Sequence, residues 1–567
     1  MDNVLERADS ITTEVIRHAL ASGAKQMKTV LVRTAVSPIV YEGQDFACAL
    51  YDRQMRLLAQ AETIPIFVGT MGFCIQAAVD ALGGEAMLEP DDVLLYNVPY
   101  FSGSHAQDAA IIEPVFLDGR VLIGYAITKA HWGDIGGKSP YPTDSTDVYQ
   151  EGTCFPGVKL YRAGRLVDDI LRIIIANSRM SEAIKGDIHA QVVSVKAGAN
   201  ELKRICARYG FTVFELCVER MLEHGEAIVR AFLSALPNGR YSGKAHLDND
   251  GLSDVAIEFE VALEISGTDV IFDFTQAPDA LAGPLNCPLP MTICAARVAI
   301  AMLAGNGEMP NEGTFRPIRV ETRRGSMFDP QSPAPCFMYA WPAFQAIEAV
   351  NEALAKVFDQ LVPSGSAADV CGIVAFGYDP ASAAPFFAGV ALPCGQGAHA
   401  SGDGATLFIP GLSQSTLPST ELMEMKFPVL FDRVEFIADT GGAGRFRGGL
   451  ALAYHWTPLV DVELFCTIER TKVPSWAQQG GLSGLANSFV IEYADGARTE
   501  MRKGSGKKVS AGARFCVTCG GGGGYGPPSE RSIEAVRRDL AEGYITAAHA
   551  RQHYPHAMSG ESNDHRQ

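Results

Sequence analysis

The sequence predicts a mixed α/β protein (α+β) of several domains, with mixed sheets flanked by helices and a Gly-rich, β-dominated C-terminal part. Three observations indicate this. The first 370 residues contain both helical periodicity and apolar strand patterns, and the chain beyond them is Gly-rich and β-prone. In addition, a chain of 567 residues is too long to fold around one ordinary hydrophobic core. We expect an N-terminal α/β domain at 1–199, a helical and β-hairpin domain at 200–370, a Gly-rich β-dominated domain at 371–551, and a flexible tail at 552–567.

The first expected elements are a helix and a hairpin. A helix at 10–35, capped by Ser10, has apolar residues on one face. These residues are Ile11, Val15, Ile16, Ala19, Leu20 and Met27. Alternating apolar residues at 46–50, a turn at 52–53 and a second run at 55–58 predict the hairpin.

The next elements alternate between strand and helix. Continuous apolar runs at 91–96 and 120–127 are typical of strands in a sheet covered on both faces. Helical periodicity runs over 200–236 and breaks at Gly210.

A second β region and two helices follow. Apolar runs at 255–265 and 270–274 flank a Ser-Gly-Thr-Asp turn and predict a hairpin. Helices are expected at 291–304 and 346–361. Beyond residue 370 we expect three Gly-rich loops, at 395–404, 440–449 and 519–527.

Composition restricts the classes of partner. The 47 basic and 65 acidic residues give a net charge of −18 with no basic run, so we expect neither nucleic acid nor membrane as a partner. The N-terminus does not match a secretory signal, and the apolar windows at 93–98 and 121–127 are too short to span a bilayer. Thirteen cysteines without a spacing pattern suit reduced thiols, and hence a cytoplasmic location.

Two short polar segments carry the most informative pattern in the chain. The first, Ser-His-Ala-Gln-Asp, contains His105 and Asp108, and the second, Ala-His-Trp-Gly-Asp, contains His131 and Asp134. Each follows or ends a strand, and Asp45 opens an earlier one. Imidazole nitrogen and carboxylate oxygen are the ligands of a borderline divalent ion, so a metal site is one hypothesis. The alternative is that the histidines are satisfied loop residues and the carboxylates are turn or cap residues.

No nucleotide-binding motif accompanies this pattern. The run at 134–139 ends in Gly-Gly-Lys-Ser, but a Walker A loop needs glycine where Trp132 stands. The glycine run at 520–524 lacks Lys-Ser/Thr and predicts a loop with tight backbone contacts. If ATP takes part, we expect another polypeptide to bind it. A GxSxG elbow is also absent from the sequence.

Short motifs spread over nearly the whole chain match one known family in order. They include Asn-Val-Pro-Tyr at 97–100, the two histidine segments, Asn-Glu-Gly-Thr-Phe-Arg-Pro at 311–317 and Asp-Thr-Gly-Gly at 439–442. Further matches lie at 32–38, 45–52, 151–152, 158–160, 186–191, 447–449 and 520–526. Through these motifs the chain resembles the B-type subunit of the ATP-dependent hydantoinase/oxoprolinase family. Relatives of that family include the metal-bearing subunits of acetone and acetophenone carboxylases.

The resemblance implies a heteromer with an A-type ATPase subunit, with two copies of each chain. The partner would bind ATP and phosphorylate the substrate, and this chain would finish the reaction at one divalent ion (Zn, Mn or Fe). The implied metal ligands are Asp45, His105, Asp108 and His131. The expected catalytic residues are His131 and Asp134, with Asp134 holding His131 in its tautomer. A turn role for Asp134 is the alternative.

The leading expectation is an enzyme that hydrolyses a cyclic amide, a hydantoin or a lactam. A ketone carboxylase subunit is the first alternative, because it would use the same ligands and partner. A scaffold subunit without chemistry is the second. The chain also departs from the family. Val98 stands where the family usually has Asp, Ala106 and Gln107 where it has Leu-Pro, and Trp132 where it often has a second His. The ligand positions are kept, while the residues around them differ.

Overall fold

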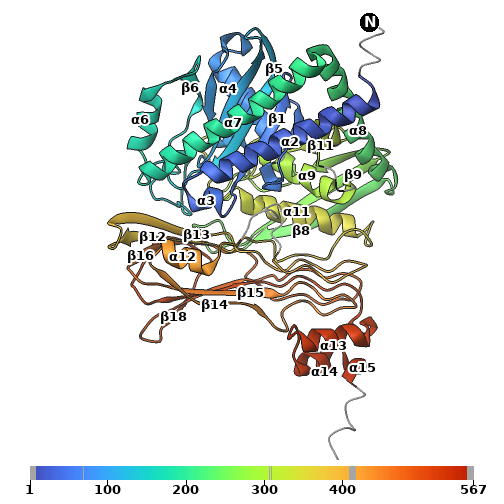
Figure 1. Ribbon diagram of the computed structural model, residues 1–567. Coiled ribbons are helices and arrows are strands. Elements are labelled where there is room, and N and C mark those ends of the chain that lie inside the picture. The colour runs from blue at the N-terminus through green and yellow to red at the C-terminus, as the bar shows by residue number, and fades with distance from the viewer. Residues whose placement is uncertain (1–7, 68, 306, 308, 408–416, 559–567) are drawn as a thin grey trace, which may run out of the picture. The chain divides into compact units, whose positions relative to one another are not determined.

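The structure is a computed structural model that describes residues 8–67, 69–305, 307, 309–407 and 417–558. The chain forms two units, each with its own internal packing (Figure 1). The first unit contains the described residues up to Arg240 and Leu263–Ala343. The second contains Tyr241–Ala262 and the described residues from Phe344 onward.

A seven-stranded sheet forms the centre of the first unit, in the order β2-β1-β5-β4-β3-β6-β7. Its strands are β1 (Phe46–Asp52), β2 (Leu57–Gln60), β3 (Val93–Tyr96), β4 (Asp108–Leu117), β5 (Val121–His131), β6 (Pro156–Arg162) and β7 (Arg165–Leu166). All neighbouring pairs are antiparallel. Every residue of β1 and of β3 is buried, so both faces of the sheet are covered there. For β3 the continuous apolar run at 91–96 predicted this.

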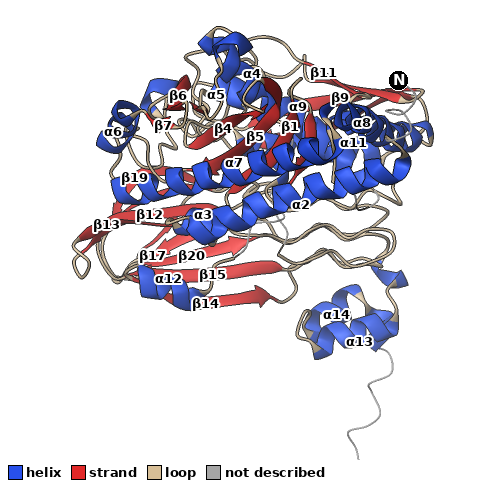
Figure 2. Ribbon diagram, turned by 45° about the horizontal axis from the view of Figure 1, so that its top comes forward, coloured by secondary structure: helices blue, strands red, loops and turns tan. Residues whose placement is uncertain are grey.

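Helices pack around this sheet and beside it in the first unit (Figure 2). They are α2 (Ser10–Thr34), α3 (Pro38–Tyr41), α4 (Met71–Leu82), α5 (Pro99–Ser102), α6 (Asp168–Ala176), α7 (Ser181–Tyr209), α8 (Phe211–Ser234), α9 (Leu289–Ala304) and α10 (Glu312–Phe315). The long helices α2 and α7 pack against each other and against the sheet. Gly210, with φ +86°, separates α7 from α8, at the break that the sequence predicted.

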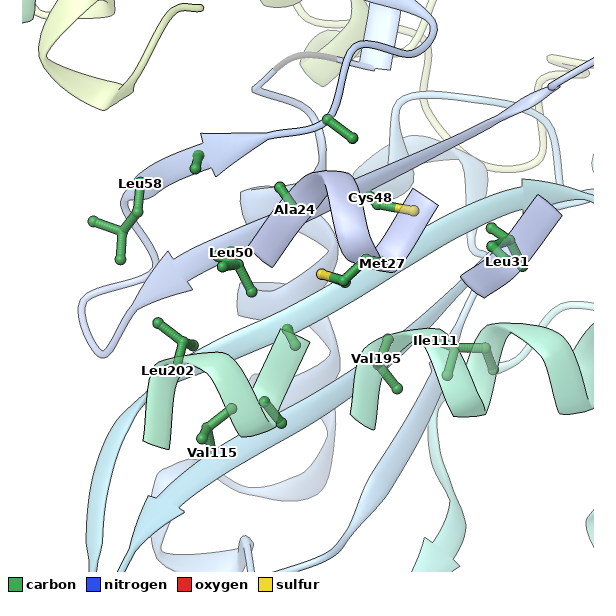
Figure 3. Packing of buried hydrophobic residues seen from close by; sticks show 14 of the residues in the cluster. Ala24, Met27, Leu31, Cys48, Leu50, Leu58, Ile111, Val115, Val195 and Leu202 are labelled. Atoms are coloured by element: carbon green, nitrogen blue, oxygen red, sulfur yellow. The ribbon is translucent and has the colours of Figure 1, made fainter. Parts of the chain in front are cut away.

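The core of the first unit lies between these two helices and the strands (Figure 3). Met27 from α2 and Leu202 from α7 face Leu50 of β1 and Val115 of β4, and all four are fully buried. Burying one side chain of this size contributes about 2 kcal/mol to the stability of the folded state. The amphipathic faces of α2 and α7 therefore hold the sheet whose strand ends carry the polar segments.

The chain passes between the two units within β8 (Gly239–Leu247), β9 (Ile257–Ser266) and α11 (Ala340–Ala355). The strands β10 (Asp269–Asp273) and β11 (Ile318–Glu321) pair in parallel. With β9 and β8 they form a sheet in the order β11-β10-β9-β8.

Two further sheets belong to the second unit. One has the order β13-β12-β16-β19 and contains β12 (Gly372–Asp379), β13 (Ala384–Val390), β16 (Val462–Thr467) and β19 (Lys503–Val509). The other has the order β14-β15-β20-β17-β18 and contains β14 (Val429–Ile437), β15 (Ala451–Pro458), β17 (Ser488–Glu492), β18 (Arg498–Glu500) and β20 (Arg514–Cys519). The second unit also contains the helices α12 (Thr420–Lys426), α13 (Ile533–Ala541), α14 (Ala547–His553) and α15 (Pro555–Met558).

The Gly-rich stretches of the second unit pack against one another as extended backbone. We call this the glycine bundle; its segments are 364–367, 395–398, 404–405, 440–443, 446–449, 475–478, 481–485 and 520–526. Backbone hydrogen bonds join the segments: Gly522 N donates to Gly449 O at 2.9 Å, and Gly442 N donates to Gly522 O at 2.8 Å. A Cβ on Gly522 would lie 1.9 Å from Gln396 O. The tight backbone contacts predicted for 520–524 are confirmed, and they extend to the other two Gly-rich stretches.

Several expected boundaries differ in the structure. Asp9, not Ser10, caps α2: its side chain accepts from Thr12 N at 2.7 Å, and Ser10 is already helical. Ile11 at the exposed start of α2 is 73% exposed, so it lies off the buried face assigned to it. The expected domain boundary at 199/200 falls inside α7, which runs unbroken past it. The three-domain division stays a prediction.

Two later boundaries also move. Helix α11 begins at Ala340, before the expected 346. Residues 552–553 and 555–558 of the expected flexible tail belong to α14 and α15, and Tyr554 between the two helices is fully buried; residues 559–567 lie outside the described residues.

One stretch is long and apolar enough to qualify as a candidate membrane span by length and composition alone. It is Pro65–Leu82, in which residue 68 lies outside the described residues; its mean hydropathy is 1.5, and 53% of it is buried in the fold. Its α-helical part is α4, of 12 residues. At 1.5 Å per residue such a helix is about 18 Å long, whereas the hydrocarbon core of a bilayer is about 30 Å thick. Helix α4 is therefore too short to cross a bilayer.

Candidate metal centre

Antiparallel pairing of β4 with β5 brings the two polar segments together. Asp108 is the first residue of β4, His131 is the last residue of β5, and they lie opposite each other in the register. Asp45 immediately precedes β1, the other neighbour of β5, and its carbonyl accepts from His131 N at 3.1 Å. Three strand ends thus place their polar residues at one edge of the sheet.

A tight turn before β4 sets the position of His105. Helix α5 ends at Ser102 and is followed by Gly103, which has φ +76°; a Cβ there would lie 3.0 Å from Pro290 Cβ. Only glycine suits that conformation and that space. The side-chain amide of Asn97 then donates to Ala106 O at 2.7 Å and to Thr153 O at 3.0 Å, which fixes the turn to a second loop.

Three donor atoms converge at this edge. His105 Nε2 lies 2.9 Å from Asp108 Oδ1 and 2.9 Å from His131 Nδ1, and His131 Nδ1 lies 3.1 Å from Asp108 Oδ1. The three side chains are 8%, 1% and 6% exposed, so they are nearly removed from bulk water. They are the one group of three or more possible metal-ligating side chains found in the described part of the chain.

The protonation of His105 follows from its other neighbour. His105 Nδ1 lies 2.8 Å from Phe337 O, and a carbonyl oxygen only accepts, so Nδ1 carries a proton. In the neutral ring Nε2 then presents a lone pair to Asp108 and His131. The hydroxyl of Tyr339 donates to Asp108 Oδ2 at 2.8 Å, which leaves Oδ1 facing the two imidazoles.

This donor set fits a divalent ion. Lone pairs that point at one another repel unless a proton or a cation lies between them. Two imidazole nitrogens and one carboxylate oxygen suit Zn, Mn or Fe. The second hydrogen bonds of His105 and Asp108 are of the kind that orient metal ligands.

The electrostatics of the group are strongly coupled. Burial alone would raise the pKa of Asp108, but His105 and His131 hold it well below its usual range. Burial would lower the pKa of His131, yet the hydrogen bond to Asp108 and the charges of Asp45 and Asp108 raise it. The first effect keeps Asp108 in its ionised form, and the second shows how strongly His131 interacts with the neighbouring carboxylates.

Asp45 is not among the three residues whose donor atoms converge. Its carboxyl is outside the group of three, whose ligand atoms all lie within 4.8 Å of one another. It still interacts electrostatically with His131, Asp108 and His105, and burial raises its pKa to about 6. Asp45 is therefore near the centre, and its role as a ligand stays a prediction.

Asp134 has other partners than the expected His131. Its carboxylate accepts from Arg179 N and from Arg179 Nη1, both at 2.5 Å, and from Gly136 N at 3.3 Å. No hydrogen bond joins it to His131 among the described residues. Gly136 has φ +82°, and a Cβ there would lie 2.5 Å from Asn177 O. Asp134 thus shapes the 134–137 turn, the alternative that the sequence left open.

The sequence did not point to Phe337 and Tyr339 as residues of the centre. Phe337 acts through its backbone carbonyl, which leaves no trace in residue type. Tyr339 lies more than two hundred residues from Asp108, with no motif around it. Their rings also enclose His105, with centroids 5.0 Å and 5.1 Å from its own.

Comparison with protein families gives one match over most of the chain. The family described as Hydantoinase B/oxoprolinase matches residues 9–528. Among curated proteins, the beta chain of the caprolactamase of Pseudomonas jessenii is 27% identical over 98% of this chain and 97% of its own length. The putative B-type component of a D-/L-hydantoinase of Pseudomonas sp. (strain NS671) is also 27% identical, over 97% and 95%.

Solved structures agree with these matches. A chain of the ATP-dependent caprolactamase from Pseudomonas jessenii superposes with a TM-score of 0.89 at 26% identity, over 96% of each chain. A chain of a nucleotide-free acetone carboxylase, from work on ATP-dependent acetone carboxylation, superposes with a TM-score of 0.86 at 18% identity. It covers 96% of this chain and 79% of the other. The second likeness establishes a shared fold.

Proposed function

The chain belongs to the hydantoinase B/oxoprolinase family, and from this premise we propose that it is the metal-bearing subunit of an ATP-dependent enzyme that hydrolyses a cyclic amide. The observation that carries the proposal is the convergence of His105 Nε2, Asp108 Oδ1 and His131 Nδ1 in a nearly buried site. The relatives of known name support the substrate class, a lactam or hydantoin.

Cyclic amides need activation because resonance weakens the carbonyl carbon as an electrophile. We propose that an A-type ATPase subunit transfers the γ-phosphoryl group to the amide oxygen. One water then adds to the activated carbon, the ring C–N bond breaks, and the nitrogen leaves as an amine. A second water releases phosphate. One lactam, one ATP and two waters therefore give one ring-opened amino acid, ADP and phosphate.

The residues of the centre would hold a divalent ion, with His105, Asp108 and His131 as ligands and Asp45 as a fourth candidate. Such an ion supplies Lewis-acid polarisation of the reacting oxygen or of the attacking water. Phe337 keeps His105 in the Nδ1–H tautomer, and Tyr339 keeps Asp108 oriented. The low exposure of the three side chains limits water around the reacting group, which strengthens electrostatic interactions there.

The test is reconstitution of the chain with an A-type subunit and a panel of lactams and hydantoins of different ring size. We expect ATP-dependent formation of the ring-opened acid, abolished in His105→Ala while the circular dichroism spectrum stays that of the parent. Incorporation of labelled bicarbonate into a ketone, with no ring opening of any lactam or hydantoin, would instead identify the ketone carboxylase alternative. A parent chain that holds no metal, alone or with its partner, would favour the scaffold alternative.

A further inference from the structure

The centre depends on an irregular segment far along the chain, residues 334–339. This segment supplies both outer contacts of the cluster, the Phe337 carbonyl at His105 and the Tyr339 hydroxyl at Asp108. It has no regular secondary structure until α11 begins at Ala340. Its precision must therefore come from the groups that hold it.

Neutral groups anchor three of its residues. The Tyr100 hydroxyl donates to Ala334 O at 2.7 Å, Asn286 Nδ2 donates to Pro335 O at 2.8 Å, and Met338 N donates to Pro284 O at 2.9 Å. The remaining two residues before Tyr339 are Cys336 and Phe337.

A buried carboxylate anchors those two. Glu151 is fully buried, and its Oε1 accepts from Cys336 N at 2.8 Å, from Phe337 N at 2.8 Å and from Ser145 Oγ at 2.7 Å. Its Oε2 has no hydrogen-bond partner among the residues that the structure describes. Burial of a carboxyl group is costly, and hydrogen bonds offset that cost. Because two of the three donors on Oε1 are backbone N–H groups, these bonds constrain the backbone position of Cys336 and Phe337.

The position of Glu151 is itself fixed by the first polar segment. Gln107, between His105 and Asp108, donates from Nε2 to Glu151 O at 2.8 Å. The backbone of Glu151 is thus held beside one half of the cluster, while its side chain holds the residue whose carbonyl faces His105.

We propose that Glu151 is a positioning residue of the centre. By binding the N–H groups of Cys336 and Phe337 it aims the Phe337 carbonyl at His105 Nδ1, and so turns Nε2 toward Asp108 and His131. The proposal rests on the proposed function for the identity of the ligand, a divalent cation. The orientation of His105 is a property of the chain itself.

Metal affinity of the full-length chain tests this role. Glu151→Ala removes the acceptor oxygen. Glu151→Asp shortens the side chain by one methylene, so that the oxygen lies farther from the N–H groups of Cys336 and Phe337. Glu151→Gln keeps an acceptor oxygen on a side chain of the same length. We expect the dissociation constant for Zn²⁺, measured by competition with a chromogenic chelator, to rise tenfold or more for Ala and Asp. For Gln it should stay within about threefold of the parent.

Glu113 offers a matched control. It is also buried, in β4, and burial raises its pKa to about 7, as it does for Glu151. It does not contact the 334–339 segment in any hydrogen bond of the described residues. Glu113→Ala should lower the melting temperature and leave Zn²⁺ affinity unchanged. Equal Zn²⁺ affinity of folded parent, Glu151→Asp and Glu151→Ala would overturn the proposal, and mark Glu151 as a stabilising residue only.

A measurement without metal separates this proposal from the proposed function. In the metal-free chain with ¹⁵N-labelled histidine, we expect His105 to show the Nδ1–H tautomer in the parent and in Glu151→Gln, and a mixture of tautomers in Glu151→Asp. An unchanged tautomer in Glu151→Asp would overturn the positioning role. If the parent binds no Zn²⁺, the proposed function fails, and this spectrum alone decides the role of Glu151.

Discussion

The hydroxyl of Tyr339 binds Asp108 Oδ2 at 2.8 Å, so that only Oδ1 of this carboxylate faces His105 and His131. Tyr339→Phe removes that hydrogen bond and keeps the ring beside His105. Since such outer contacts typically change metal affinity by about 10–100-fold, we expect a fall of about tenfold in Zn²⁺ affinity. Chelator competition measures it. The control is Tyr454→Phe, a buried hydroxyl without a partner among the described residues, which should leave affinity unchanged.

Replacement of Asp134 separates its two candidate roles. Because its carboxylate binds Arg179 and not His131, Asp134→Asn should lower the free energy of unfolding by about 1–3 kcal/mol. Zn²⁺ affinity should stay within about threefold of the parent. Urea unfolding and chelator competition measure the two quantities. If Asp134→Asn lost Zn²⁺ as completely as His105→Ala, the turn role of Asp134 would be contradicted, and the expected role in orienting His131 would be favoured.

Glu151 makes stability depend on pH with a definite sign. Burial raises the pKa of its carboxyl from the ordinary 4.5 to about 7. Between these values the folded state keeps a proton that the unfolded state releases, so stability is lost as pH rises through this window. We expect the parent's free energy of unfolding, relative to that of Glu151→Gln, to fall by about 3 kcal/mol between pH 4.5 and 8. Parallel pH profiles for the two proteins would contradict it.

The glycine bundle tolerates no side chain at its closest contacts. In Gly522→Ala the new Cβ would lie 1.9 Å from Gln396 O, a backbone atom that cannot move without loss of hydrogen bonds. We expect a loss of stability of about 3 kcal/mol or more, and faster amide exchange in 520–526. Gly119→Ala is the control: φ is +65° and no atom lies within 4 Å, so it should cost about 1 kcal/mol. Similar losses in both variants would refute the packing argument.

Much of the first unit could be predicted from its pattern because local signals and packing agree there. The hairpin of β1 and β2, the buried strands β3 and β5, and the break at Gly210 all follow from periodicity or from a single special residue. The cap of α2 was placed one residue late, since Asp9 and Ser10 are both good caps and only geometry distinguishes them.

The centre was predictable only in part. Asp108 and His131 lie at facing ends of paired strands, which residue types near strand ends could suggest. Phe337 and Tyr339 reach the site through tertiary folding, and no local signal records that. Glu151 stood among the residues of the resemblance, but its contact with Cys336 and Phe337 depends on a segment without regular structure.

The glycine bundle bears on the order in which the second unit can fold. Its segments join residues far apart in sequence: Ser364 Oγ, for example, donates to Gly524 O, 160 residues away. Closing such a long loop costs conformational entropy, and this cost arises before the contacts that offset it can form. Glycine residues also lack apolar side chains whose burial could bring the segments together at an early stage of folding. The sheets of this unit must therefore bring the segments side by side first. We infer that the bundle closes late, and that a ribosome-bound chain lacking residues 520–526 leaves it open.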